Sequence, residues 1–457
     1  MTMHLIDSLA TTEPLAEVFS DESVLSAMLH FEVALARAEA RLGIIPQSAA
    51  DAIAASVKTD RFDISELCRA AQRAGTPAIP LVKAVTEHVR KSNPDAARFV
   101  HWGATSQDVC DTAMSLLLQR AEPILKSDLS RLENALAVLV DQHKDTAMLG
   151  RTLMQPAPPV TFGLKAAGWI GAVRRGKYRL RAGFNTSAIT QFGGASGTLA
   201  SLGDQGAPLV KILTEELGLK AFPEAPWHTQ RDRLATLICA CGVLTGSLGK
   251  MARDISLLMQ SEVAEAAEPG GDGRGGSSTM PHKQNPTACS LTLAAAHRVP
   301  GLVASYLSAM VQEHERGVGG WQSEWPIVSA VIQSTGLAIA SMAEVAEGLS
   351  VDAERMRANI EKTNGVIFAE RAMMLLASKL GRDGAHRVLE AATKKCVAEG
   401  RHLAGVLAEI PEVTAHLDAA TLQQLEAPEQ YLGSAEQFRA ALLSNSAGRS
   451  QDPEKER

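Results

Sequence analysis

Apolar side chains recur along this chain mainly three or four residues apart, which is the spacing of one face of an α-helix. One stripe, between residues 21 and 42, consists of Val24, Met28, Phe31, Leu35 and Ala38. A second helix is expected over residues 47–57. No stretch shows the convincing apolar-polar alternation of a strand. The pattern therefore predicts an all-α fold.

The longest helical pattern covers about residues 229–267, roughly 58 Å at 1.5 Å per residue. Its apolar positions alternate four and three residues apart: Leu237, Cys241, Leu244, Leu248, Met251, Ile255 and Leu258. Gly242, Gly246 and Gly249 form a second stripe that would let another helix approach closely. Two packing faces favour a helix at the centre of a long bundle. A two-chain coiled coil is the alternative, but the seam lacks flanking pairs of opposite charge.

A chain of 457 residues is long enough for about three domains. The expected parts are an N-terminal helical domain (1–105), a central long-helix domain (106–350), a C-terminal helical domain (351–443) and a disordered tail (444–457). Within the central domain, Pro123 is expected to interrupt a helix, and residues 149–157 are expected to form a loop.

Composition narrows the class of protein. Apolar residues are 46% and charged residues 21% of the chain, which is ordinary for a soluble globular protein. A net charge of −6 argues against nucleic-acid binding. The six cysteines are scattered, so we expect reduced thiols. No signal peptide, membrane span or cluster with metal-ligand spacing is recognisable, so we expect a cytoplasmic protein without metal or other cofactor.

Residues 268–286 stand out because five glycines fall between positions 270 and 276. Glycine inside a helix costs roughly 1 kcal/mol relative to alanine, so this cluster marks a backbone that bends or moves. Ser277, Lys283 and Asn285 follow the glycines. A mobile segment that ends in such groups is typical of a lid that carries part of an active site.

Other interpretations of this stretch were weighed. It matches G-x-G-x-x-G, but a helix rather than a strand precedes it and Pro281 follows, which disfavours a dinucleotide site. A P-loop would need lysine where Ser277 stands. A plain flexible linker stays open on this stretch alone, although a linker would have no use for Met280, Pro281 and Asn285.

A second polar cluster covers residues 101–108, at the start of another helical pattern. Thr105 or Ser106 suits the N-cap, and Asp108 completes a capping box. A helix start with free N–H groups and adjacent hydroxyls is a natural carboxylate site. On these residues alone, a simple cap with a structural His101 is the more frequent case.

Residues 276–286 resemble the signature loop of the fumarase/aspartase superfamily, and residues 101–108 resemble a segment whose Thr-Ser pair holds substrate carboxylates there. The resemblance implies a three-domain fumarase/aspartase-like fold with a long central helical bundle. It implies a catalytic serine at Ser277, a nearby lysine at Lys283, and elimination or addition beside a carboxylate. It also implies a homotetramer in which each active site is assembled from three chains.

Segments at residues 99–108, 191–195, 226–232 and 320–325 resemble the bacterial 3-carboxy-cis,cis-muconate cycloisomerases. This resemblance reaches about residue 443 and implies ring closure of a tricarboxylate diene to 4-carboxymuconolactone. The superfamily usually has a histidine at position 153 to assist the leaving group, whereas this chain has Leu153. A carboxylate leaving group is stable at neutral pH and needs no such acid.

The resemblance and the motifs give one set of candidate residues for a small anionic di- or tricarboxylate. The candidate catalytic residues are Ser277, Lys283 and Asn285. The candidate substrate-binding residues are His101, Thr105, Ser106, Gln107, Thr152, Leu153, Gln155, Gln191 and Arg316. The lactonising enzymes can carry Trp at position 153, so Leu153 suggests a wider pocket that accepts 3-sulfomuconate.

Two competing functions remain. An adenylosuccinate lyase would share the residues from Ser277 to Pro286, but it would need the histidine that Leu153 replaces. A non-catalytic structural homologue, like the lens crystallins related to argininosuccinate lyase, would have no need of the intact Ser277, Lys283 and Asn285.

Overall fold

The computed structural model describes the chain except for residues 1–4, 220–224, 272–274, 277–278, 281–282 and 445–457. Helices dominate the described residues, so the all-α prediction is confirmed. The chain divides into two compact units, and each is described by itself. Unit 1 comprises Met1–Ser130, Arg175–Gly249 and Leu291–Ser341, and unit 2 comprises Arg131–Arg174, Lys250–Ser290 and Met342–Arg457. The tail predicted at 444–457 lies, apart from Ser444, outside the described residues.

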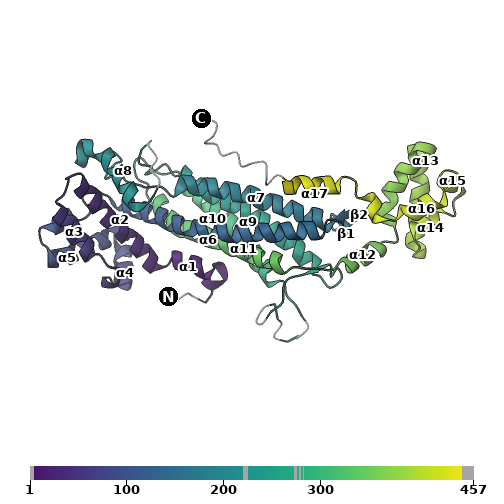
Figure 1. The fold of residues 1–457 in the computed structure, drawn as a ribbon, viewed down its shortest axis with the longest axis horizontal. Coiled ribbons are helices and arrows are strands. Elements are labelled where there is room, and N and C mark those ends of the chain that lie inside the picture. The colour runs from purple at the N-terminus through teal and green to yellow at the C-terminus, as the bar shows by residue number, and fades with distance from the viewer. Residues whose placement is uncertain (1–4, 220–224, 272–274, 277–278, 281–282, 445–457) are drawn as a thin grey trace. The chain divides into compact units, whose positions relative to one another are not determined.

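The helices and strands appear in Figure 1 under the labels used below. The α-helices are α1 (Glu13–Val18), α2 (Asp21–Arg41), α3 (Gln47–Ser56), α4 (Ile64–Ala74), α5 (Ala78–Ser92), α6 (Ser106–Gln142), α7 (Phe162–Ser187), α8 (Gly206–Leu217), α9 (Asp232–Leu258), α10 (Thr287–Ala309), α11 (Gly320–Gly348), α12 (Ala353–Glu361), α13 (Ala369–Glu399), α14 (Leu403–Leu407), α15 (Pro411–Thr414), α16 (Ala419–Leu425) and α17 (Ala435–Ser444). The strands are β1 (Ala147–Thr152), β2 (Gln155–Thr161), β3 (Ala266–Ala267) and β4 (Ser350–Val351).

One hydrophobic core of unit 1 forms where α2 packs against α3 and α8, while α5 packs against α3 (Figure 1). Ser20 begins α2, because its side chain accepts the backbone N–H of Ser23 at 3.1 Å. The predicted stripe points into this core, with Met28, Phe31 and Leu35 buried. The expected bounds of these first two helices agree with α2 and α3 to within one residue.

Helix α9 confirms the predicted apolar seam, since all seven seam residues are buried. In unit 1, two of its glycines face α10: a Cβ on Gly242 would lie 3.0 Å from Val303, and one on Gly249 would lie 2.6 Å from Ala296. Nothing lies within 4 Å of such a Cβ at Gly246. Two of the three glycines therefore allow close helix packing, and the third is not needed for it.

Three expectations about local structure were wrong. Helix α9 (Asp232–Leu258) is shorter than residues 229–267, because the chain leaves the helix in a turn over residues 259–263. The predicted loop at 149–157 belongs to the antiparallel hairpin of β1 and β2. Pro123 lies inside α6 without ending it. The loss of one backbone hydrogen bond does not break a helix of 37 residues that is packed along its apolar face.

Among the described residues, α9 and α11 are long and apolar enough to cross a membrane by length and composition. Their most apolar windows are 61% and 72% buried inside the protein. Packing against other helices accounts for this apolar character.

The core of unit 2 lies between α13, α14 and α16, which gather together in Figure 1, and it includes Ala147 and Leu149 of β1. Helix α12 packs against the same strand. These contacts hold the base of the hairpin of β1 and β2 in the core, and its turn after Thr152 lies outside the core.

Candidate active site

The predicted N-terminus of α6 forms in unit 1 as expected. The backbone N–H of Thr105 donates to the Asp108 carboxylate at 3.1 Å, and the N–H of Asp108 donates to the Thr105 carbonyl at 3.0 Å. One half of the capping box is therefore present: the Asp108 carboxylate caps the Thr105 N–H, while the Thr105 hydroxyl does not accept the Asp108 N–H. The hydroxyls of Thr105 and Ser106 are on half-buried residues and make no hydrogen bond to any other described residue. They are available to a ligand at the helix start.

Asp108 also organises a neighbouring loop, residues 191–197. Its carboxylate accepts the backbone N–H groups of Gly193 and Gly194, both at 2.9 Å, and the amide of Gln191 at 3.2 Å. Its side chain is fully buried. One carboxylate thus fixes this glycine-containing loop against the start of α6.

The two glutamines predicted to bind substrate are held by the protein itself. The Gln107 amide nitrogen donates to Asp111 at 3.1 Å and to the His228 carbonyl at 2.8 Å. The Gln191 amide donates to Asp108, and its oxygen accepts the backbone N–H of Trp227 at 2.8 Å. Both residues are fully buried. In this arrangement they support the site rather than present a free amide.

Arg316 is brought to the same place in unit 1. Its Nε donates to the Gln107 side-chain oxygen at 3.3 Å, and its Nη2 donates to the Ala195 carbonyl at 3.1 Å. The residue is half-buried, and its Nη1 has no hydrogen-bond partner in the described part of the chain. Arg316 can therefore still bind an anion.

His101 lies in the loop before α6 with a φ of 60°, a conformation that is uncommon outside glycine. Its Nδ1 is 2.7 Å from the buried Glu32 carboxylate. Burial lowers the pKa of His101, but the charge and hydrogen bond of Glu32 and the charge of Asp108 together raise it above its ordinary value. The close Glu32 contact favours the predicted binding or orienting role, with Nε2 left for a ligand.

A buried ion cluster supports this end of unit 1. Arg231 donates to Asp111 at 2.8 Å and to Glu324 at 2.6 Å, and all three side chains are at most 3% exposed. The guanidinium also donates to the His228 carbonyl at 3.1 Å. Trp321 donates to Asp111 at 3.1 Å. The cluster connects α6 and α11 with Arg231, the residue before α9, beside the predicted carboxylate-binding groups.

In unit 2, the hairpin carries Thr152, Leu153 and Gln155 to its tip. Thr152 pairs with Gln155, so Leu153 and Met154 form a two-residue turn. Both have positive φ, 48° and 66°, which such turns normally obtain from Asn-Gly. Leu153 is 97% exposed and Met154 is 70% exposed. Strained backbone of this kind tends to occur at functional sites.

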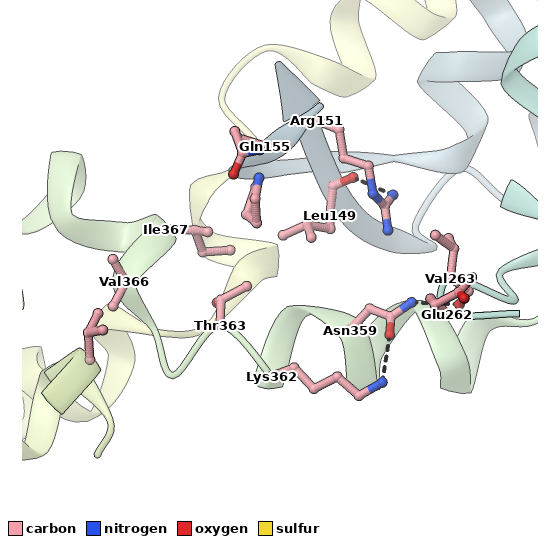
Figure 2. Close-up of a pocket in the computed structure, with 12 residues that line it drawn as sticks. Leu149, Arg151, Gln155, Glu262, Val263, Asn359, Lys362, Thr363, Val366 and Ile367 are labelled. Carbon is pink, nitrogen blue, oxygen red and sulfur yellow. Dashed lines mark hydrogen bonds between the residues drawn. The ribbon is translucent and has the colours of Figure 1, made fainter. Parts of the chain in front are cut away.

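Behind this tip, Arg151 makes a bidentate ion pair with the fully buried Glu265, at 2.6 and 2.9 Å. Asn359 donates to the same carboxylate at 2.8 Å. Arg151 and Asn359 line a cavity of about 540 Å³. Figure 2 shows both, with Gln155 on the cavity wall and Lys362 hydrogen-bonded to Asn359. The network holds the hairpin from behind.

The glycine-rich loop of unit 2 is closed at its base. The buried Glu268 carboxylate accepts the backbone N–H groups of Ala288 and Cys289 at 3.1 and 2.7 Å. Further along, Asn285 donates its N–H to the Gly275 carbonyl at 2.8 Å. Lys283 is exposed and Asn285 half-buried, and the predicted Ser277 lies outside the described residues.

Sequence reasoning missed Glu32, Arg231 and His228. Glu32 lies on an apolar helix face, where a carboxylate is unexpected and would have been a signal. Arg231 and His228 lie within residues 226–232, one of the segments that resemble the cycloisomerases, but nothing in that segment indicates that they are buried. Among the described residues, no three or more His, Cys, Asp or Glu side chains are placed to hold a metal ion.

Comparison with known proteins adds to this geometry. Residues 9–301 match the family described as Lyase, and residues 365–441 match the family described as Adenylosuccinate lyase C-terminus. The chain is 49% identical over 425 residues to the 3-carboxy-cis,cis-muconate cycloisomerase of Bradyrhizobium diazoefficiens, with 93% of this chain and 94% of that protein covered.

A solved structure of similar fold is the 3-carboxy-cis,cis-muconate lactonizing enzyme from Pseudomonas putida. It has a TM-score of 0.91 and 44% identity, and the match covers 97% of this chain and 99% of that one. The nitrosuccinate lyase of Streptomyces davaonensis is 41% identical over 94% of this chain and 92% of its own length.

Proposed function

Because the chain belongs to the fumarase/aspartase superfamily of lyases, we propose that it is a cycloisomerase that converts 3-carboxy-cis,cis-muconate to 4-carboxymuconolactone. Enzymes of this family act on small carboxylate substrates and are typically oligomeric. The observation that carries the specific proposal is near-full-length similarity to proteins named for this reaction. The site in unit 1 agrees with it, since free hydroxyls, a helix N-terminus and Arg316 suit carboxylates.

In the proposed reaction, one substrate carboxylate adds to a carbon of the diene, forming the lactone C–O bond. Ser277 gives a proton to the neighbouring carbon, which lies beside another carboxylate. In the reverse direction Ser277 removes that proton, and the charge spreads into the carboxylate as an aci-anion. Lys283 and Asn285 stabilise that charge. The C–O bond then breaks, and the carboxylate leaves without an acid.

Leu153 supports the choice between leaving groups. An amine leaves better when protonated, so a lyase that releases one gains from an acid at the hairpin tip. Leu153 and its neighbour Met154 offer none. This disfavours an adenylosuccinate lyase-type reaction, although the C-terminal match carries that family's name.

The active sites are proposed to be shared between chains of a homotetramer. The exposed, apolar hairpin tip of unit 2 supports this, because Leu153 and Met154 lie uncovered in the single chain. Mixing two inactive variants, T105A/S106A and S277A, tests it directly. If sites are shared, unfolding and refolding the mixture restores part of the activity, whereas an unchanged baseline excludes sharing between these two groups.

The proposed function is tested by following the loss of the muconate diene absorbance in the ultraviolet. Adenylosuccinate and nitrosuccinate are assayed beside it. We expect turnover of the muconate alone, and S277A should lower kcat by about 10²- to 10⁴-fold. Turnover of either succinate but not of the muconate would overturn the proposal.

A second substrate is suggested by the size of residue 153. Leucine is much smaller than the tryptophan that lactonising enzymes can carry there, so a tetrahedral sulfonate could fit in 3-sulfomuconate. The comparison is kcat/KM for the carboxy- and sulfo-substrates in the wild type and in L153W. We expect L153W to lose the sulfo-substrate selectively, and no sulfonate turnover by the wild type would refute the idea.

A further inference from the structure

We propose that His228 is a further substrate-binding residue, which donates from Nδ1 to a substrate carboxylate while Asp108 positions its ring through Nε2. The inference deepens the proposed function and rests on it. Nothing in the sequence motif suggested this role for His228. Three observations in unit 1 support it.

The first observation is that the two nitrogens of His228 face different surroundings. Nε2 is buried, lies 3.5 Å from an oxygen of Asp108, and has no hydrogen bond. Nδ1 is not among the buried unpartnered atoms and makes no hydrogen bond to the described residues. It lies beside Gly197, where a Cβ would be 3.4 Å away. Nδ1 is therefore the nitrogen that a ligand can reach.

The second observation is that the ring is tightly placed. A Cβ at Gly193 would lie 2.7 Å from the Nε2 of His228, so only glycine allows the ring to lie there. The backbone carbonyl of His228 accepts from Gln107 at 2.8 Å and from Arg231 at 3.1 Å. The chain thus fixes both the ring and its backbone, although the residue contributes no apolar packing group.

The third observation is that His228 and Arg316 flank the same short loop. Arg316 donates to the Ala195 carbonyl, and the His228 ring lies against Gly193 and Gly197. Gln107 contacts both residues, through its oxygen to Arg316 and through its nitrogen to the His228 carbonyl. The Arg316 guanidinium and the His228 ring therefore converge beside the α6 N-terminus, which suits a ligand with more than one carboxylate.

The charges around the ring agree with this role. Asp108 faces Nε2 from α6, and Arg316 approaches from the loop before α11. Beyond Gln107 lies the ion cluster of Arg231 with the two carboxylates of Asp111 and Glu324. With Nε2 turned toward the Asp108 carboxylate, Nδ1 is the ring nitrogen left to donate its hydrogen to a carboxylate oxygen of the ligand.

Two substitutions separate the proposed role from a purely structural one. Asparagine places its amide nitrogen near the position of Nδ1, and glutamine places its nitrogen near that of Nε2. If Nδ1 binds substrate, H228Q raises KM about tenfold to a hundredfold with kcat changed less than about threefold, and H228N raises KM less. If His228 serves only as a partner of Asp108, H228N raises KM more than H228Q does.

The experiment combines kinetics on 3-carboxy-cis,cis-muconate with calorimetric titration of tricarballylate, a simple tricarboxylate. The matched control is H88Q, on α5, whose ring has the Arg61 carbonyl as its one hydrogen-bond partner among the residues that the structure describes. We expect the Kd of tricarballylate to rise in H228Q by the same factor as KM, and to stay unchanged in H88Q.

The outcomes distinguish this inference from the proposed function. Wild-type turnover with an unchanged KM and Kd in both H228Q and H228N overturns the role of His228 alone. A wild type that does not turn over the muconate overturns the proposed function, while the tricarballylate titration still decides on His228. A larger loss in H228N than in H228Q, or parallel falls in kcat and melting temperature, assigns the residue a structural role and refutes the inference.

Discussion

Removing the buried guanidinium of Arg231 should strongly destabilise unit 1. The Arg231 side chain is 1% exposed and pairs with Asp111 and Glu324, which are 3% and 1% exposed. The R231M variant would leave two buried carboxylates without a counter-charge. Breaking a buried pair by removing one partner typically costs about 3–5 kcal/mol, so we expect a loss in that range.

The stability lost in R231M should depend on pH. Burial already raises the pKa of Glu324, and Arg231 opposes that rise. Without the guanidinium, the folded protein holds a proton on Glu324 to higher pH than the unfolded chain does. Stability of R231M therefore falls as pH rises through the range between these two pKa values. The deficit relative to wild type should be smaller at pH 5 than at pH 8.

The assay is urea unfolding followed by circular dichroism at both pH values. With a slope of at least about 3 kcal/mol/M for a protein of this size, the midpoint should move by on the order of 1 M. The matched control is R357M, since Arg357 and Glu429 form an exposed pair that is worth at most about 1 kcal/mol. Equal losses in R231M and R357M, or a deficit that grows toward pH 5, would refute this reasoning.

Three further changes test other parts of the structure. E268Q weakens the tie at the base of the glycine-rich loop and should cost about 0.5–2 kcal/mol, measured as a lower unfolding midpoint. Replacing Leu153 and Met154 by Asn-Gly relieves positive φ and should raise the midpoint while lowering kcat/KM, so a gain in both would contradict a role in binding. E32Q removes the carboxylate that raises the pKa of His101. The stability that E32Q loses relative to the wild type should be greatest below the unfolded pKa of histidine, near 6.5, and should disappear at higher pH. Unfolding measured at pH 5.5 and 8.5 would show this.

Much of the fold could be predicted from the sequence, because helical periodicity reports burial directly. The seam of α9 is buried as expected, and α2 and α3 have nearly the expected bounds. The hairpin of β1 and β2 escaped prediction because its turn, Leu153 and Met154, lacks the Asn-Gly or similar pair that identifies such turns. The three-domain division stays a prediction.

The candidate site was predictable where a motif combines local geometry with chemistry. The capping contact between the Asp108 carboxylate and the Thr105 N–H is local, and the structure contains it. The Arg231 cluster and the Glu32–His101 contact join residues 93 and 69 positions apart, and one chain gives no signal for such pairings. Long-range polar contacts depend on packing that periodicity does not specify.

Hydrogen-bond saturation divides the predicted binding residues of unit 1 into two kinds. The Gln191 amide already donates to Asp108 and accepts from Trp227, so a substrate could bind it only by displacing one of these partners. Such an exchange leaves a buried group unpaired, at about 1–3 kcal/mol, which offsets most of what the new hydrogen bond would contribute. Thr105 and Ser106 lose no such partner when a carboxylate arrives. We therefore expect affinity for the substrate to come from these hydroxyls and from Arg316, while the buried glutamines hold these groups in position.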